Sequence, residues 1–108
     1  MILYGIPTCD SCRRALKELE RAGHAVRFRD VRADPLTPAE TARLVAEFGD
    51  RIVNRQSTTY RAFSDYLKAS DPEAQIAANP AVMKRPVIEA EGRFWLGWDE
   101  ATARALAG

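Results

Sequence analysis

The first 31 residues alternate between two strand-like segments and one helical pattern, and this order restricts the fold more than any other feature. Residues 1–6 are almost entirely apolar and predict a buried strand. Between Cys12 and Leu19, apolar side chains recur at i, i+3, i+4 and i+7, which predicts a helix with one apolar face. Alternating side chains over 25–31 predict a second strand. This order forms a βαβ unit, whose strands pair in parallel through a right-handed crossover.

Two cysteines lie at the turn between the first strand and the helix, where Thr8 is the expected N-cap. The unpaired N–H groups and positive dipole of a helix N-terminus favour the thiolate, which is the reactive form of cysteine. Arg13 and Arg14 add positive charge just downstream. The apolar spacing predicts that Cys12 points inward while Cys9 stays accessible, which suits a resolving and an attacking thiol. A C-x-x-C motif beside a βαβ pattern is typical of thioredoxin-like redox proteins.

The rest of the chain predicts a group of helices, a hairpin and a last helix. We expect one domain over 1–108, with a helical insertion at about 37–80 between a βαβ half and a ββα half. The predicted elements are a helix over 37–48 that opens on a capping box, irregular chain over 50–59, helical spacing over 60–67, a helix over 70–78, a hairpin over 86–96 and a helix over 100–107.

Composition narrows the classes of partner. The formal net charge is +1, which argues against direct nucleic-acid or membrane binding. Residues 1–32 carry a local charge of +3, which suits an anionic partner such as glutathione or an oxyanion.

The N-terminus lacks the pattern of a signal peptide and no apolar stretch has membrane-spanning length, so we expect a cytoplasmic protein. Cysteines there are more often catalytic or sensing than structural. With His24 as the single histidine, a metal site is not expected.

Four stretches, spread in order over nearly the whole chain, carry a resemblance to a known family. They are residues 4–15, 54–60, 79–88 and 96–100. Together they resemble the arsenate reductase (ArsC) family, with its Spx-like and YffB-like branches. The resemblance implies an α/β fold, a thioredoxin-like mixed β-sheet of βαβ plus ββα with an inserted helical segment.

The resemblance also implies roles for individual residues. Cys9 falls on the family's nucleophilic cysteine. Arg85 falls on the arginine before the proline that opens the third strand, and the Arg85–Pro86 bond is expected to be cis. Arsenate reductases place three arginines around the oxyanion, of which the middle one falls on Asn54 or Arg55. The C-terminal arginine falls on Gly97 and is therefore missing.

The expected site combines these residues with the thiol pair. Cys9, Cys12 and Arg85 are the candidate catalytic residues, and Arg85 would stabilise the Cys9 thiolate. Two alternatives stay open. Cys12 resolves a mixed disulfide or simply fills the apolar face of its helix, and Asn54 and Arg55 bind substrate or only organise their loop. The candidate substrate-binding residues are Arg13, Asn54, Arg55 and Pro86.

The leading hypothesis is a monomeric cytoplasmic thiol–disulfide oxidoreductase. Its electrons would come from glutathione as co-substrate or from a thioredoxin or glutaredoxin system, with no tightly bound cofactor. The first alternative is an Spx-like redox-sensing transcriptional regulator that binds RNA polymerase. The second is arsenate reduction proper, which Gly97 weakens. The sequence leaves open whether the protein is an enzyme or a regulator.

Overall fold

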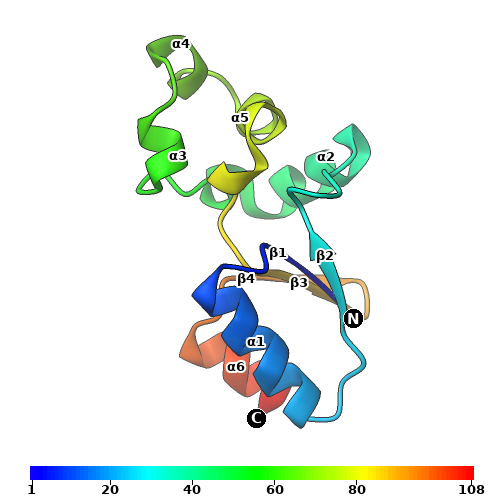
Figure 1. The fold of residues 1–108 in the computed structure, drawn as a ribbon. Coiled ribbons are helices and arrows are strands. Elements are labelled where there is room, and N and C mark those ends of the chain that lie inside the picture. The colour runs from blue at the N-terminus through cyan, green and yellow to red at the C-terminus, as the bar shows by residue number, and fades with distance from the viewer. The chain divides into compact units, whose positions relative to one another are not determined.

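The computed structural model describes all 108 residues, which form two compact units (Figure 1). One unit consists of Met1–Asp34 and Arg85–Gly108, and we call it the thiol unit. The other, Pro35–Lys84, is the helical unit. It contains the segment that the sequence predicts as a helical insertion. The assignment of the whole chain to a single domain stays a prediction.

The thiol unit is built on a four-stranded mixed sheet in the order β2-β1-β3-β4. Strand β1 (Ile2–Gly5) pairs in parallel with β2 (Arg27–Asp30) and antiparallel with β3 (Val87–Ala90). Strand β4 (Arg93–Leu96) pairs antiparallel with β3. A parallel pair needs a long crossover, and α1 (Asp10–Arg21) supplies it. This is the thioredoxin-like arrangement of a βαβ half and a ββα half.

Helices α1 and α6 (Glu100–Ala107) lie side by side on one face of this sheet (Figure 1). Leu3 and Ile88 are register partners on β1 and β3, so they project from the same face and pack against α1. Burying a leucine such as Leu3 stabilises the fold by about 1.5–3 kcal/mol. The buried core cluster of the unit is Leu3, Cys12, Ala15, Leu19, Ile88 and Trp98.

The helical unit is a series of short helices, most of which begin at a polar N-cap. Thr37 and Glu40 form the predicted capping box. Ser64 accepts a hydrogen bond from the Leu67 N–H at 3.2 Å. The elements are α2 (Pro38–Phe48), a 3₁₀ turn η1 (Gly49–Ile52), α3 (Thr58–Arg61), α4 (Asp65–Lys68), α5 (Pro72–Ala78) and a 3₁₀ turn η2 (Pro80–Val82).

Three sequence predictions of local structure are wrong. The N-cap of α1 is Cys9 rather than Thr8, because the Cys9 N–H closes a tight turn onto the Ile6 carbonyl at 3.0 Å. The stretch 50–59 contains parts of η1 and α3. The helical spacing over 60–67 falls on two single-turn helices, because α3 ends at the C-cap Ala62 and α4 begins after the N-cap Ser64.

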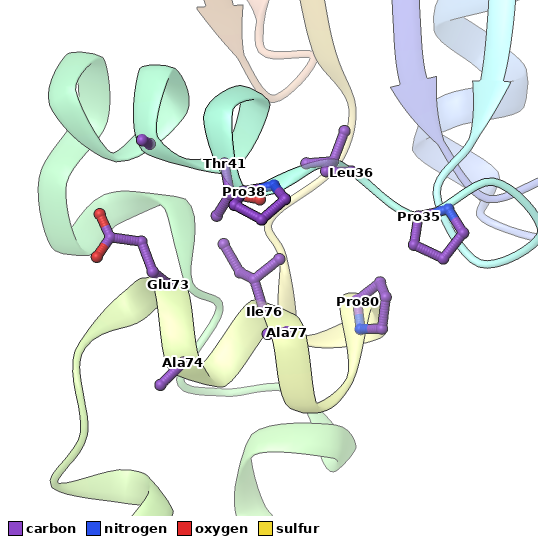
Figure 2. A pocket seen from close by; sticks show the side chains of 10 residues that line it. Pro35, Leu36, Pro38, Thr41, Glu73, Ala74, Ile76, Ala77 and Pro80 are labelled. Carbon is purple, nitrogen blue, oxygen red and sulfur yellow. The ribbon is translucent and has the colours of Figure 1, made fainter.

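An apolar cavity of about 620 Å³ lies within the helical unit, between the start of α2 and α5. Figure 2 shows the side chain of Ile76 pointing toward Pro38 and Thr41. Pro35 and Pro80 line another part of the cavity. Nothing in the structure shows what would cover it. No helix in the chain is long and apolar enough to cross a membrane.

Gln75 is a buried polar residue that organises the connection between α4 and α5. Its side-chain Nε2 lies 3.1 Å from the Leu67 carbonyl oxygen and 3.2 Å from those of Lys68 and Ser70. The carbonyls at a helix C-terminus have no partner within the helix. One buried amide group therefore connects three carbonyl oxygens of the α4–α5 connection, of which that of Leu67 also accepts the Ser70 N–H at 3.0 Å.

We expect Gln75→Leu to destabilise the protein by about 1–3 kcal/mol, because the partly buried carbonyls lose the hydrogen bonds from the Gln75 amide while the side-chain volume stays similar. Urea unfolding measures the change as a lower midpoint with an unchanged m-value. The matched control is Gln56→Leu at an exposed position, which should change the free energy of unfolding by less than about 0.5 kcal/mol. Equal effects of the two substitutions would contradict the role assigned to Gln75.

Candidate thiol site

Cys9 lies at the N-terminus of α1, directly after the turn that follows β1. Its backbone is extended, as expected for an N-cap residue, and its carbonyl accepts the Arg13 N–H at 3.0 Å. The turn holds it there through the hydrogen bond from the Cys9 N–H to the Ile6 carbonyl. Its thiol is partly exposed at the positive end of the helix dipole.

Cys12 lies one helical turn further on and is completely buried. Its neighbour on β1 is Gly5, and a Cβ added at Gly5 would lie only 2.5 Å from the Cys12 Sγ. The backbone N–H of Ile6 hydrogen-bonds to the Cys12 sulfur. The two cysteines also hydrogen-bond to each other through their side chains. As the apolar spacing of α1 predicts, one thiol is therefore accessible and the other is enclosed.

The surroundings of Cys9 lower its pKa below that of an ordinary thiol. Burial alone raises the pKa, but hydrogen bonds from the Cys12 backbone N–H and the Cys12 thiol stabilise the thiolate. The Arg85 guanidinium adds a hydrogen bond and a positive charge. These donors outweigh the loss of hydration, so Cys9 is the thiol that ionises first.

The pKa of Cys12 is shifted in the opposite direction, because burial outweighs the groups that would stabilise its thiolate. Burial raises its pKa to about 12, with a further contribution from the negative charge and hydrogen bonding of Cys9. The hydrogen bond from Ile6 and the charge of Arg85 act in the other direction but are weaker. Cys12 therefore keeps its proton while Cys9 is a thiolate.

Arg85 and Pro86 lie at the start of β3. The Arg85–Pro86 bond is cis, as the resemblance implies. Pro86 is fully buried, and its carbonyl accepts the N–H of Gly97 at 2.7 Å. This fixed segment places the half-buried Arg85 next to the Cys9 sulfur.

The other predicted substrate-binding residues are differently placed. Arg13 is exposed on the first turn of α1, within the thiol unit. Asn54 and Arg55 belong to the helical unit. There the Asn54 Oδ1 accepts the Gln56 N–H at 3.0 Å and its carbonyl accepts the Ser57 hydroxyl at 2.7 Å. Arg55 is an exposed partner of Asp50 at 3.8 Å. Asn54 thus organises its own loop, and a binding role for either residue stays a prediction.

Sequence reasoning missed Gly5 and Ile6, the two residues that enclose Cys12 from the side of β1. The available signal was a glycine at the last position of a buried strand, immediately before a C-x-x-C turn. A glycine inside a strand pattern often marks a close approach of another part of the chain. No group of three or more His, Cys, Asp or Glu side chains in the chain could hold a metal ion.

The sheet order, the thiol pair at the start of α1 and the cis proline define a protein with a thioredoxin-like fold. The sequence model of the ArsC family matches residues 4–106, so the chain belongs to the ArsC family.

Known relatives come from more than one branch of this family. The global transcriptional regulator Spx of Listeria innocua is 30% identical over 94% of this chain and 82% of its own length. A solved YffB protein is 32% identical, covers 99% of this chain and 98% of its own, and superposes with a TM-score of 0.88. A solved arsenate reductase (ArsC) related protein from Brucella melitensis is 28% identical over 96% of this chain and 91% of its own, with a TM-score of 0.74.

The charge of Arg85 should be visible in the pH dependence of Cys9 alkylation. Because thiolate is the reacting form, a lowered pKa moves the half-maximal rate with iodoacetamide below the pH of an ordinary thiol. Arg85→Met removes a cation and a donor from the thiolate, so the Cys9 pKa rises and the profile moves to higher pH. Intact mass should show a single label on the folded protein, because Cys12 is buried.

Arg21→Met is the matched control, since it removes the same charge from an exposed position in the last turn of α1, away from Cys9. Its profile should stay close to that of the wild type. If Arg85→Met also leaves the profile unchanged, Arg85 does not stabilise the thiolate.

Proposed function

We propose that the protein is a cytoplasmic thiol–disulfide oxidoreductase that uses Cys9 as its nucleophile and glutathione as its co-substrate. The observation that carries this proposal is the contrast between the two thiols. Cys9 is partly exposed with a lowered pKa, while Cys12, one turn away, is buried with its pKa raised to about 12. Thiol–disulfide exchange requires an accessible thiolate for attack and gains from a second thiol held nearby.

The chemistry takes two exchange steps. The Cys9 thiolate attacks one sulfur of a disulfide, forms a mixed disulfide and releases the other sulfur as a thiolate, which takes a proton from solvent. Cys12 then loses its proton to solvent and attacks the Cys9 sulfur, releasing the second thiolate. The disulfide substrate gains two electrons, and the protein is left with a Cys9–Cys12 disulfide. One glutathione thiolate then attacks the Cys9 sulfur, the exposed one, and releases Cys12 as a thiolate, which takes a proton. A second glutathione thiolate attacks the glutathione sulfur of this mixed disulfide, which frees the Cys9 thiolate and releases oxidised glutathione.

Arg85 and the helix assist the first step. Both favour the thiolate of Cys9 over the thiol, and the Arg85 guanidinium can also pair with a carboxylate of glutathione. Arg13, which is exposed on α1, is proposed as part of the substrate surface of the thiol unit. Pro86 is buried, so its proposed contribution to substrate binding is to hold the neighbouring Arg85 in place.

Intact mass after exposure to oxidised glutathione tests the two roles. The wild type should lose two hydrogens as it forms the internal disulfide. Cys12→Ser should retain one glutathione, because nothing resolves its mixed disulfide. Cys9→Ser should do neither, because the remaining thiol is buried and protonated.

The reduced wild type kept without oxidised glutathione is the control. Two results would reject the proposal: an unmodified wild type, or a Cys9→Ser protein that still forms a glutathione adduct at the wild-type rate.

A second candidate function is that of an Spx-like redox-sensing regulator that binds RNA polymerase. The similarity to the Listeria innocua transcriptional regulator Spx favours it, together with the presence of both Cys9 and Cys12. In this function the same disulfide would switch binding on or off instead of carrying turnover.

A pulldown with tagged protein distinguishes the two functions. The protein is immobilised in its reduced and oxidised forms, and RNA polymerase subunits are identified by mass spectrometry. The regulator hypothesis expects polymerase in one redox state and its loss in the other, with Cys12→Ser insensitive to oxidation. Absence of polymerase subunits in both states would eliminate it.

Arsenate reduction is the third candidate and has the least support. It shares the Cys9 nucleophile and Arg85, but glycine occupies position 97, where the resemblance places the C-terminal arginine. An oxyanion with several negative charges is held best by several guanidinium groups at once.

A further inference from the structure

At the end of β1, Gly5 and Ile6 form a packing site for the Cys12 sulfur, which we call the seat. Only a glycine at position 5 leaves enough space for the sulfur there. A Cβ at Gly5 would lie 2.5 Å from the Cys12 Sγ, 3.1 Å from the Cys12 Cβ and 3.2 Å from a methyl group of Leu3. All three atoms belong to buried residues, so none of them can move aside into solvent. The Ile6 N–H directs the same sulfur by a hydrogen bond.

The seat determines where the sulfur of Cys12 lies relative to Cys9. The two side chains are within hydrogen-bond reach of each other. A methyl group at position 5 would occupy the space of the Cys12 sulfur itself. Either α1 would then lift away from β1, or the Cys12 side chain would turn to another rotamer. Both changes alter the approach of one sulfur to the other.

We propose that Gly5 is a positioning residue that directs the resolution of the mixed disulfide to Cys12 rather than to a second glutathione. This proposal rests on the proposed oxidoreductase function. Gly5 acts chiefly on the second exchange step, in which the Cys12 sulfur bonds to the Cys9 sulfur, the bond from Cys9 to glutathione breaks, and glutathione leaves as the thiolate. It affects the first step only through the hydrogen bond from the Cys12 thiol that stabilises the Cys9 thiolate.

Time-resolved intact mass with oxidised glutathione tests the proposal on wild type and Gly5→Ala. In the wild type the glutathione adduct should be transient and give way to the internal disulfide. In Gly5→Ala the adduct should form and then persist, with resolution slowed about 10- to 100-fold by the misplaced sulfur. Iodoacetamide labelling of Cys9 reports separately on the loss of the hydrogen bond from the Cys12 thiol, and its rate should fall by less than the rate of resolution.

Leu19→Ala is the stability control, because it removes a buried side chain from the same face of α1 without touching the seat. It should lower the Tm and still resolve the adduct as the wild type does. A merely structural role of Gly5 would make the two variants behave alike.

If the Gly5→Ala protein folds poorly, a comparison of Tm values in two backgrounds still tests the contact between position 5 and Cys12. Cys12→Ala removes the sulfur that the new methyl group would meet, so Gly5→Ala should lower the Tm less in the Cys12→Ala background than in the wild type. Equal losses of Tm, or wild-type resolution by Gly5→Ala, would overturn the positioning role. A wild type that forms neither adduct nor disulfide would instead reject the oxidoreductase function, so the two failures are distinguishable.

Discussion

The close packing of the first turn of α1 against the end of β1 is the constraint on which the thiol site depends. The packing encloses Cys12, and the absence of a side chain at Gly5 allows the two elements to approach. Without this approach the helix N-terminus would not present Cys9 beside Arg85 at the start of β3. The contact between α1 and β1 therefore belongs both to the hydrophobic core and to the thiol site.

The same burial has opposite consequences for the two thiols, because their hydrogen-bond partners differ. Burial raises the pKa of both sulfurs. Cys9 receives enough hydrogen bonds and positive charge to bring its pKa below that of an ordinary thiol, whereas the pKa of Cys12 stays raised. A thiolate at Cys9 also holds the proton on Cys12, since two adjacent negative charges in a poorly hydrated site repel strongly. Once Cys9 ionises, the pair therefore carries one proton and one negative charge, and the proposed exchange would start from this state.

The sequence predicted the elements whose side chains repeat with a clear period, and missed those set by single contacts. The βαβ unit, the capping box at Thr37 and the hairpin follow from local patterns, and the structure contains all three. The residues over 60–67 divide into α3, which ends at the C-cap Ala62, and α4, whose first turn is capped by the hydroxyl of Ser64, although their spacing would also suit a continuous helix. The roles of Gly5 and Gln75 depend on partners brought together by folding, which spacing along the chain does not reveal.

The backbone conformation at Gly97 bears on the choice between two of the proposed functions, disulfide exchange and arsenate reduction. It lies between β4 and α6 with a φ of 81°, and its N–H donates to the Pro86 carbonyl at 2.7 Å. A residue with a Cβ in this left-handed conformation costs about 1–3 kcal/mol, so the glycine here serves the segment beside the cis proline as well as leaving out a side chain. Of the predicted arginine positions in the thiol unit, Arg85 is then the one that hydrogen-bonds to Cys9. One guanidinium group matches a single carboxylate or a departing thiolate better than an oxyanion of high charge, and this favours disulfide exchange over arsenate reduction.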